Sequence, residues 1–108
     1  METTMVLHLE DGQAFRRLKD RLLTDETVNR ASIVFKDARA YAQKAGNLIV
    51  VSGTEDRLKA AAAIARAEKT ADGKPAAAEL AGKEKEEILA KLKEEEDRAI
   101  EGMGGIFG

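Results

Sequence analysis

The stretch that decides the fold is LIVV at residues 48–51, which runs directly into SGT at residues 52–54. In an extended chain these four residues make both faces apolar. A β-branched run of this kind favours a strand in the centre of a sheet. The polar SGT sequence ends that strand and caps a helix. The first helical turn then carries Glu55 and Asp56, where the helix dipole favours negative charge. The stretch therefore predicts a central strand that leads straight into an Ala-rich helix.

Two segments on the N-terminal side predict further strands of the same sheet. In residues 3–9 apolar and polar side chains alternate, which is typical of a strand with one buried face. The apolar run at residues 31–35 contains β-branched and aromatic side chains and predicts another strand. Between the two, Asp11 can cap a helix. The apolar stripe of this helix has i, i+3, i+7 spacing and consists of Phe15, Leu18 and Leu22.

The segment at residues 37–46 supports two interpretations. Its Ala content and the glycine at its end favour a helix. The strict alternation of Ala with Arg, Tyr and Gln over residues 38–43 favours a strand, and only two residues separate it from the strand before it. We favour the strand on these grounds. The expected fold is therefore α+β, with the order β-α-β-β-β-α, an antiparallel sheet and helices on one face of it.

Charge and apolar content both change near residue 70. Residues 1–69 hold 12 basic and 10 acidic residues, whereas residues 70–108 hold 6 basic and 10 acidic residues. We expect an α+β body at 1–69, a linker at 70–82, a charged and largely solvated helix at 83–101, and a Gly-rich apolar tail at 102–108. A body of this size buries only about 60% of its unfolded surface. We therefore expect it to gain stability from the charged helix or from a second copy in a homodimer.

The composition excludes several kinds of site. The chain has no Cys and a single His, so a disulfide framework, a thiolate zinc site and a Cys nucleophile are excluded. We expect His8 to be a surface or sheet-face residue, and we expect no metal, no cofactor, no catalytic residue and no enzymatic activity. The longest apolar run, residues 60–65, is far shorter than the roughly 20 residues of a membrane helix, and no signal peptide is evident. These features predict a cytoplasmic protein without membrane contact.

Basic side chains suggest nucleic-acid binding as an alternative function. Four of them lie on the predicted helix after Asp11 and can meet phosphates of RNA or DNA, while a tyrosine expected on an exposed strand face can stack on a base. The candidate residues are Arg16, Arg17, Lys19, Arg21, Arg30, Arg39 and Tyr41. The net charge of −2 means that such binding would depend on this local patch and not on the charge of the whole chain.

Residues 40–67 resemble part of a known fold. The sequence GNLIVVSG at residues 46–53, followed by an Ala-rich helix, is similar to the strand-Gly-helix segment of one half-repeat of the TATA-binding protein. Together with the expected strand order, this resemblance implies a TATA-binding-protein-like fold, found also in small archaeal proteins, for residues 1–69. The second half-repeat and the intercalating Phe pairs are missing, so the resemblance implies no DNA bending.

The last seven residues, GMGGIFG at 102–108, are similar to the tail of archaeal ribosomal stalk proteins, which ends in GLGALFG after a charged hinge. The resemblance implies that the tail binds as a short helix in a hydrophobic groove of a translation GTPase. Met103, Ile106 and Phe107 have the i, i+3, i+4 spacing that places them on one helical face. The strands expected before residue 70 do not match the all-helical body of stalk proteins. The main hypothesis is a non-enzymatic adaptor that binds a protein partner, a translation GTPase, through this tail.

Overall fold

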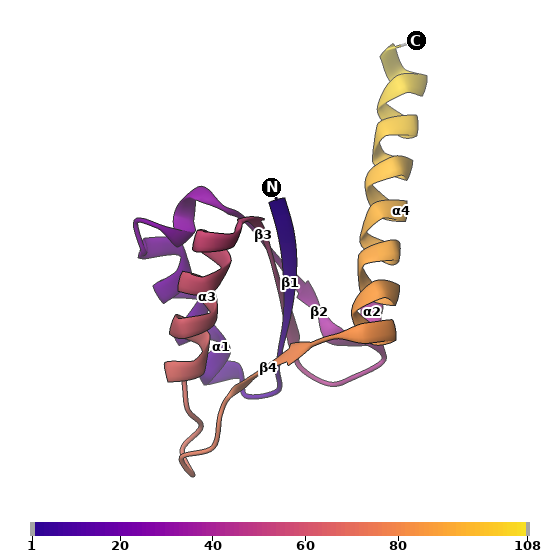
Figure 1. Ribbon diagram of the computed structural model, residues 1–108. Coiled ribbons are helices and arrows are strands. Elements are labelled where there is room, and N and C mark those ends of the chain that lie inside the picture. Colours follow the sequence, from indigo (N-terminus) through magenta and orange to yellow (C-terminus); the bar gives the residue numbers. More distant parts are fainter. Residues whose placement is uncertain (1, 108) are drawn as a thin grey trace.

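The fold is built on four antiparallel strands with helices packed on both faces of the sheet (Figure 1). The computed structural model describes the backbone of residues 2–107 and the side chains of residues 3–98. In chain order the elements are β1 (Glu2–Leu9), α1 (Gly12–Thr24), the short 3-10 helix η1 (Val28–Arg30), β2 (Ser32–Asp37), α2 (Ala38–Ala42), β3 (Asn47–Thr54), α3 (Glu55–Ala67), β4 (Ala77–Leu80) and α4 (Gly82–Phe107). The predicted α+β class is confirmed.

Strand β3 is central, as its apolar residues predict. The strands are ordered β2-β3-β1-β4, and every neighbouring pair is antiparallel. β3 pairs with β1 along its whole length, with Val50 opposite Val6 and Ile49 opposite Leu7. All four residues at 48–51 are buried. Because β1 and β3 lie between the two other strands, they form the middle of both layers of the core.

The first layer of the core lies between the sheet and helices α1 and α3. Leu18 and Leu22 of α1 are fully buried there, as the stripe on this helix predicts. The helix begins where Asp11 accepts hydrogen bonds from the backbone N–H groups of Gln13 and Ala14, at 2.9 and 3.0 Å. This cap satisfies two N–H groups that have no partner inside the helix. Helix α3 packs beside α1 through small alanine side chains.

The second face of the sheet is also covered, so the expectation of helices on one face only is wrong. Helix α2 and the first half of α4 pack there, and Ile88 of α4 is only 1% exposed. The reason is that β1 and β3 are apolar on this side too, through Val6, Leu48 and Val50. Exposing such side chains to water would cost roughly 1.5–3 kcal/mol each. The first half of α4 is therefore part of the core and not a solvated spacer.

The strand predicted over residues 37–46 is wrong, because residues 38–42 form helix α2. Asp37 ends β2 and at the same time caps α2, since its carboxylate accepts a hydrogen bond from the Arg39 N–H at 2.9 Å. No separate link is needed, so the short connection does not exclude a helix. Gln43 then takes the left-handed conformation, with φ 55°, and ends the helix. Strands and helices consequently alternate along the chain, in place of β-α-β-β-β-α.

The segment expected as a linker, residues 70–82, contains strand β4. This strand pairs with β1, with Leu80 opposite Val6, and α4 begins at Gly82. The strand sequence AAEL has little intrinsic preference for extended structure. Its conformation therefore follows from pairing with the otherwise open edge of β1. The fourth strand of the sheet therefore lies in the segment that was expected to be a linker.

Helix α4 continues beyond the sheet. Its 26 residues take in the charged segment at 83–101 and most of the tail at 102–108. The tail residues Met103, Ile106 and Phe107 lie outside the part of the chain whose side chains are described. Within the described residues, no helix combines the length and the apolar character that a membrane span requires.

We expect Ile88→Ala to lower the free energy of unfolding by about 2–5 kcal/mol, because it leaves a cavity between α4 and the sheet. Lys93→Ala, on the exposed part of the same helix, is the control and should change stability by no more than about 0.5 kcal/mol. Urea denaturation of both variants measures the difference. Equal stability of the two variants would contradict the packing of α4 on the sheet.

Candidate functional site

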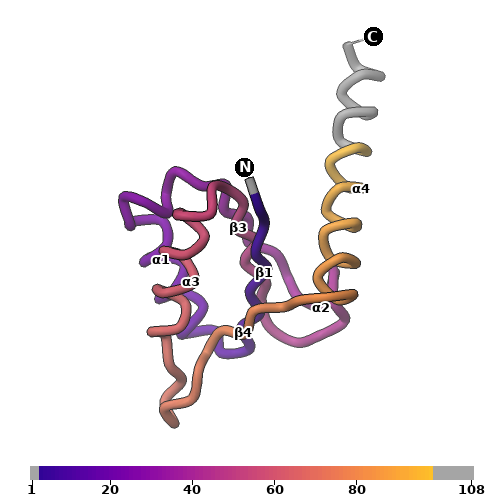
Figure 2. Tube along the Cα trace, in the orientation of Figure 1, coloured from indigo at the N-terminus to yellow at the C-terminus, as the bar shows by residue number. Residues whose placement is uncertain are grey.

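Helix α4 is packed along its first half and exposed along the part that follows. Residues 93–98 are all exposed, whereas Ile88, Leu89 and Leu92 contact the second layer of the core. Figures 1 and 2 show the helix beginning beside α2, on the side of the sheet opposite α1 and α3, and running upward alongside the strands. The molecule is correspondingly elongated, at 52 × 30 × 24 Å. The described part of α4 after residue 92 is therefore exposed, and its Glu95 still contacts Tyr41 of α2 and Lys36 of β2.

Polar contacts hold α4 against α2 and the loop that follows it. The Lys44 ammonium lies 2.6 Å from a carboxylate oxygen of Glu84. Lys91 Nζ donates a hydrogen bond to the backbone carbonyl of Tyr41 at 3.1 Å. The Tyr41 hydroxyl in turn donates to the carboxylate of Glu95. These contacts are spread over residues 84–95 of α4, so they orient the helix as well as attach it.

Tyr41 is not available for stacking on a base, which corrects its predicted role. It lies in α2 and is 7% exposed, because the segment around it is a helix and not an exposed strand. The hydrogen bond to Glu95 raises the pKa of Tyr41 above its ordinary 10.0, and burial raises it further. Both effects favour the neutral phenol. The Lys36 ammonium, 5.7 Å from the ring centroid, lowers the pKa of Tyr41 and so partly offsets these effects.

The basic side chains of α1 mostly contact the protein itself. Arg17 Nε donates to a Glu68 carboxylate oxygen at 2.6 Å, and Arg21 lies 3.7 Å from the other oxygen. The Lys19 ammonium lies 5.0 Å from the centroid of the Phe35 ring, where it meets the negative face of the aromatic system. Three of the four predicted phosphate contacts on α1 are therefore engaged in holding elements of the body together.

The remaining candidate residues lie on separate surfaces. Arg16 on α1 and Arg30 in η1 are exposed on the side of the sheet that α1 and α3 cover. Arg39 is exposed on α2, which packs on the opposite face. The sheet thus lies between Arg39 and the basic residues of α1. The structure does not assemble the predicted residues into one nucleic-acid-binding patch.

The sequence analysis missed Glu68, which follows the end of α3. Its side chain is only 7% exposed, yet it carries the two arginine contacts of α1. A buried carboxylate is stable only when it is paired and hydrogen-bonded. The signal in the sequence is the i, i+4 spacing of Arg17 and Arg21, which places both on one side of α1.

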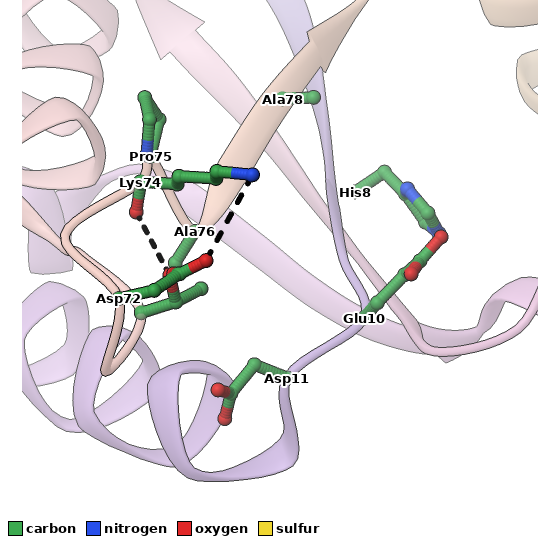
Figure 3. A pocket seen from close by; sticks show the side chains of 9 residues that line it. His8, Glu10, Asp11, Asp72, Lys74, Pro75, Ala76 and Ala78 are labelled. Atoms are coloured by element: carbon green, nitrogen blue, oxygen red, sulfur yellow. Dashed lines mark hydrogen bonds and ion pairs between the residues drawn. The ribbon is translucent and has the colours of Figure 1, made fainter.

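A polar hollow of about 580 Å³ lies where β1 ends beside β4 (Figure 3). The figure shows Asp72 and Lys74 on one side of the hollow and His8 and Glu10 on the other. His8 is nearly buried, and its Nε2 donates to the Ala45 carbonyl at 2.8 Å, since a carbonyl oxygen can only accept. This sole imidazole therefore fastens the loop before β3 to β1. As predicted, His8 lies on a face of the sheet, and the loop covers it there.

The acidic side of the hollow is formed by a turn between α3 and β4. The Thr70 hydroxyl donates a hydrogen bond to Asp72, which lowers the pKa of that carboxyl below its usual range. The Lys74 ammonium lies 3.9 Å from the same carboxylate. Among the residues with described side chains, no three His, Cys, Asp or Glu groups are placed to hold a metal ion.

We expect Tyr41 to titrate above pH 10.0 in the folded protein, since its pKa is raised. Because it is the only tyrosine, the absorbance of tyrosinate reports this group alone. Glu95→Ala should lower its pKa toward the ordinary value, and Glu96→Ala, at the next exposed position, should not. Stability from the neutral phenol is fully present below pH 10.0 and is lost as the pH rises through the raised pKa. An identical titration in both variants would contradict the contact between α2 and α4.

We expect Arg17→Ala to lower the free energy of unfolding by about 1–3 kcal/mol, because it leaves the buried Glu68 carboxylate poorly compensated. Arg16→Ala is the matched control on the same helix. Arg16 is exposed and makes no ion pair with any described side chain, so its loss should cost no more than about 0.5 kcal/mol. Thermal and urea unfolding measure both. Equal effects of the two substitutions would show that the contact with Glu68 contributes nothing.

In comparisons with protein family models, curated proteins and solved structures, no match to this chain was found. The likenesses of residues 40–67 to a TATA-binding-protein half-repeat and of residues 102–108 to a stalk tail therefore depend on the quoted residues alone. The function must accordingly be argued from the surface of the molecule.

Proposed function

We propose that the protein is a non-enzymatic adaptor, in which an α+β body carries a projecting helix that docks on a protein partner. The observation that carries this proposal is the contrast within α4, where Ile88 is 1% exposed and residues 93–98 are all exposed. A helix anchored on a sheet has already lost most of its conformational freedom. It can therefore bind with a smaller entropy cost than a free peptide.

For the partner we propose a translation GTPase, on the basis of the likeness of the tail to that of archaeal stalk proteins. Met103, Ile106 and Phe107 have the spacing of an apolar anchor set for a groove. The acidic run EEED at residues 94–97 precedes them. We expect this run to face basic side chains at the rim of the groove, since complementary charge speeds and orients association.

For the body we propose a fold of the TATA-binding-protein-like kind. The support is the β3-α3 segment, in which Gly53 is the last residue but one of a buried strand that leads directly into the helix. A Cβ on Gly53 would lie 3.1 Å from the Cβ of Ala31, so the glycine permits close packing at this point. Function does not follow from this likeness, because a fold alone does not define a binding site.

Nucleic-acid binding by the sheet and α1 has less support. Both faces of the sheet carry helices, and Tyr41 is buried beneath α4. Arg17 and Arg21 are held by Glu68. No observation in the described part of the chain favours this alternative over the adaptor.

We expect Phe107→Ala to weaken binding of the full chain to a purified archaeal translation elongation GTPase by about tenfold or more, as for a central anchor of an interface. Calorimetric titration measures the affinity. Lys93→Ala, on the exposed part of the same helix, is the control and should leave the affinity nearly unchanged. Absence of binding by the unmodified chain, or equal binding by Phe107→Ala, would contradict the proposed partner or the proposed anchor.

We expect Gly105→Ala to tighten the same interaction about fivefold. Ala favours a helix over Gly by about 1 kcal/mol, and the stalk tails have Ala at this position. The same titration measures the change. Weaker binding by Gly105→Ala would mean that the tail does not bind as a helix.

A further inference from the structure

The two edges of the sheet differ in how they are protected. Edge strand β4 has four residues, is preceded by Pro75, and carries the exposed charge of Glu79. Short length, proline and charge are the usual devices that prevent an edge from pairing with another chain. Edge strand β2 has six residues, and IVF at 33–35 forms its centre. The β2 edge has none of the devices that protect β4 along this apolar stretch.

The unpaired backbone groups of β2 belong to its apolar residues. β2 pairs with β3 in a register that places Val34 opposite Val50, and the Ala38 N–H continues the same ladder by donating to the Gly46 carbonyl at 3.0 Å. In an antiparallel ladder every second residue directs its N–H and C=O toward one neighbour. The even-numbered residues therefore bond to β3, and Ile33 and Phe35 direct their backbone groups away from the sheet.

The described residues include two exposed large apolar side chains, one of which lies on this edge strand. They are Val34 on β2, at 36% exposure, and Leu23 on α1, at 44%. Leu23 follows Phe15 and Lys19 at intervals of four residues, and both of these contact Phe35 of β2. Leu23 therefore lies on the side of α1 that carries the two contacts with Phe35. Apolar surface is thus present on both layers beside the unpaired edge.

We propose that β2 is a self-association edge, which pairs antiparallel with β2 of a second copy to form a continuous eight-stranded sheet. The backbone pattern restricts the register, because outward-directed residues must pair with one another, and we choose the register that centres the apolar stretch at 33–35 on the twofold axis. Ile33 then lies opposite Phe35 of the second copy, and the reverse pair forms by symmetry. Val34 lies opposite Val34 of the second copy, on the twofold axis. This register places apolar residues together and opposes no like charges.

The surface beside the edge fits the same partner. A groove of about 560 Å³ runs between β2, β3 and α4 on the second face of the sheet, with Ser32 and Val34 at its outer side. The carboxylates of Glu95 and Glu96 line it, and Lys36 lies 3.7 Å from Glu95. The proposed register places Lys36 of the second copy opposite Ser32, at this groove. Two carboxylates then face two ammonium groups, which favours a second copy over an unrelated strand.

The register is tested by disulfide formation, since the chain has no native cysteine. Residues on the twofold axis form a non-hydrogen-bonded pair with Cα atoms about 4.5 Å apart, within the range of a disulfide. We expect Val34→Cys to give a covalent dimer under mild oxidation. Ala78→Cys, exposed on the opposite edge strand β4, is the matched control and should cross-link far more slowly. Equal rates for the two variants would overturn the proposal.

A mixing experiment tests the same register at a second place. Ser32→Cys and Lys36→Cys chains should each remain uncross-linked alone and should form a mixed disulfide dimer when combined. Cross-linking of either chain by itself at the rate of the mixture would show that β2 pairs in another register or not at all, and would overturn the proposal.

Sedimentation measurements over a concentration series test the association without a cross-link. We expect the unmodified chain to dimerise and Val34→Lys to shift it to monomer, because two ammonium groups would meet on the axis. Ala78→Lys should leave the dimer intact. A chain that stays monomeric, or a dimer that survives Val34→Lys, would overturn the proposal. Neither outcome depends on the tail, so it is distinguishable from failure of the proposed adaptor function.

Discussion

The structure depends on one constraint, which is that the paired central strands β1 and β3 are apolar on both faces. Each face must be covered, because two strands of this length expose several large side chains per face. Helices α1 and α3 cover one side. The other side is covered by the short α2 and by α4, a helix whose sequence is otherwise strongly charged. The need to bury Val6, Leu48 and Val50 thus places the C-terminal part of the chain in the fold.

The same constraint divides α4 into two parts with different roles. Its apolar residues end at Leu92 within the described side chains, so its apolar contact with the sheet ends there, and only the ion pair of Glu95 with Lys36 of β2 follows. The contacts of Lys91 and Glu95 with Tyr41 then set the direction in which the helix leaves the body. A helix that is core at one end and exposed at the other is suited to present residues to a partner. This geometry links the packing of the body to the proposed adaptor function.

The sheet edges give the body a second candidate interaction surface, the β2 edge. Pairing of β4 protects one side of β1, and the charge and shortness of β4 protect the edge it creates. Strand β2 has unpaired backbone groups on its outer edge and apolar side chains on both of its faces. Self-association there would leave α4 projecting from each copy. Two tails on one particle would raise the apparent affinity for a partner with two grooves.

Local sequence determined the strands β1, β2 and β3, the helices α1 and α3, and the cap at Asp11, because periodicity, β-branching and capping groups act over a few residues. Only tertiary structure decided the rest. The alanines of residues 38–42 fit a helix or a strand equally, and packing beneath α4 selects the helix. Strand β4 exists because β1 offers an edge. The contacts of Glu68 with the basic side chains of α1 could not be predicted either. Glu68 is distant from α1 in sequence and becomes its neighbour only in the fold. The structures of residues 38–42 and of β4, and the pairing of Glu68, thus depend on contacts between residues far apart in the sequence, which local patterns do not encode.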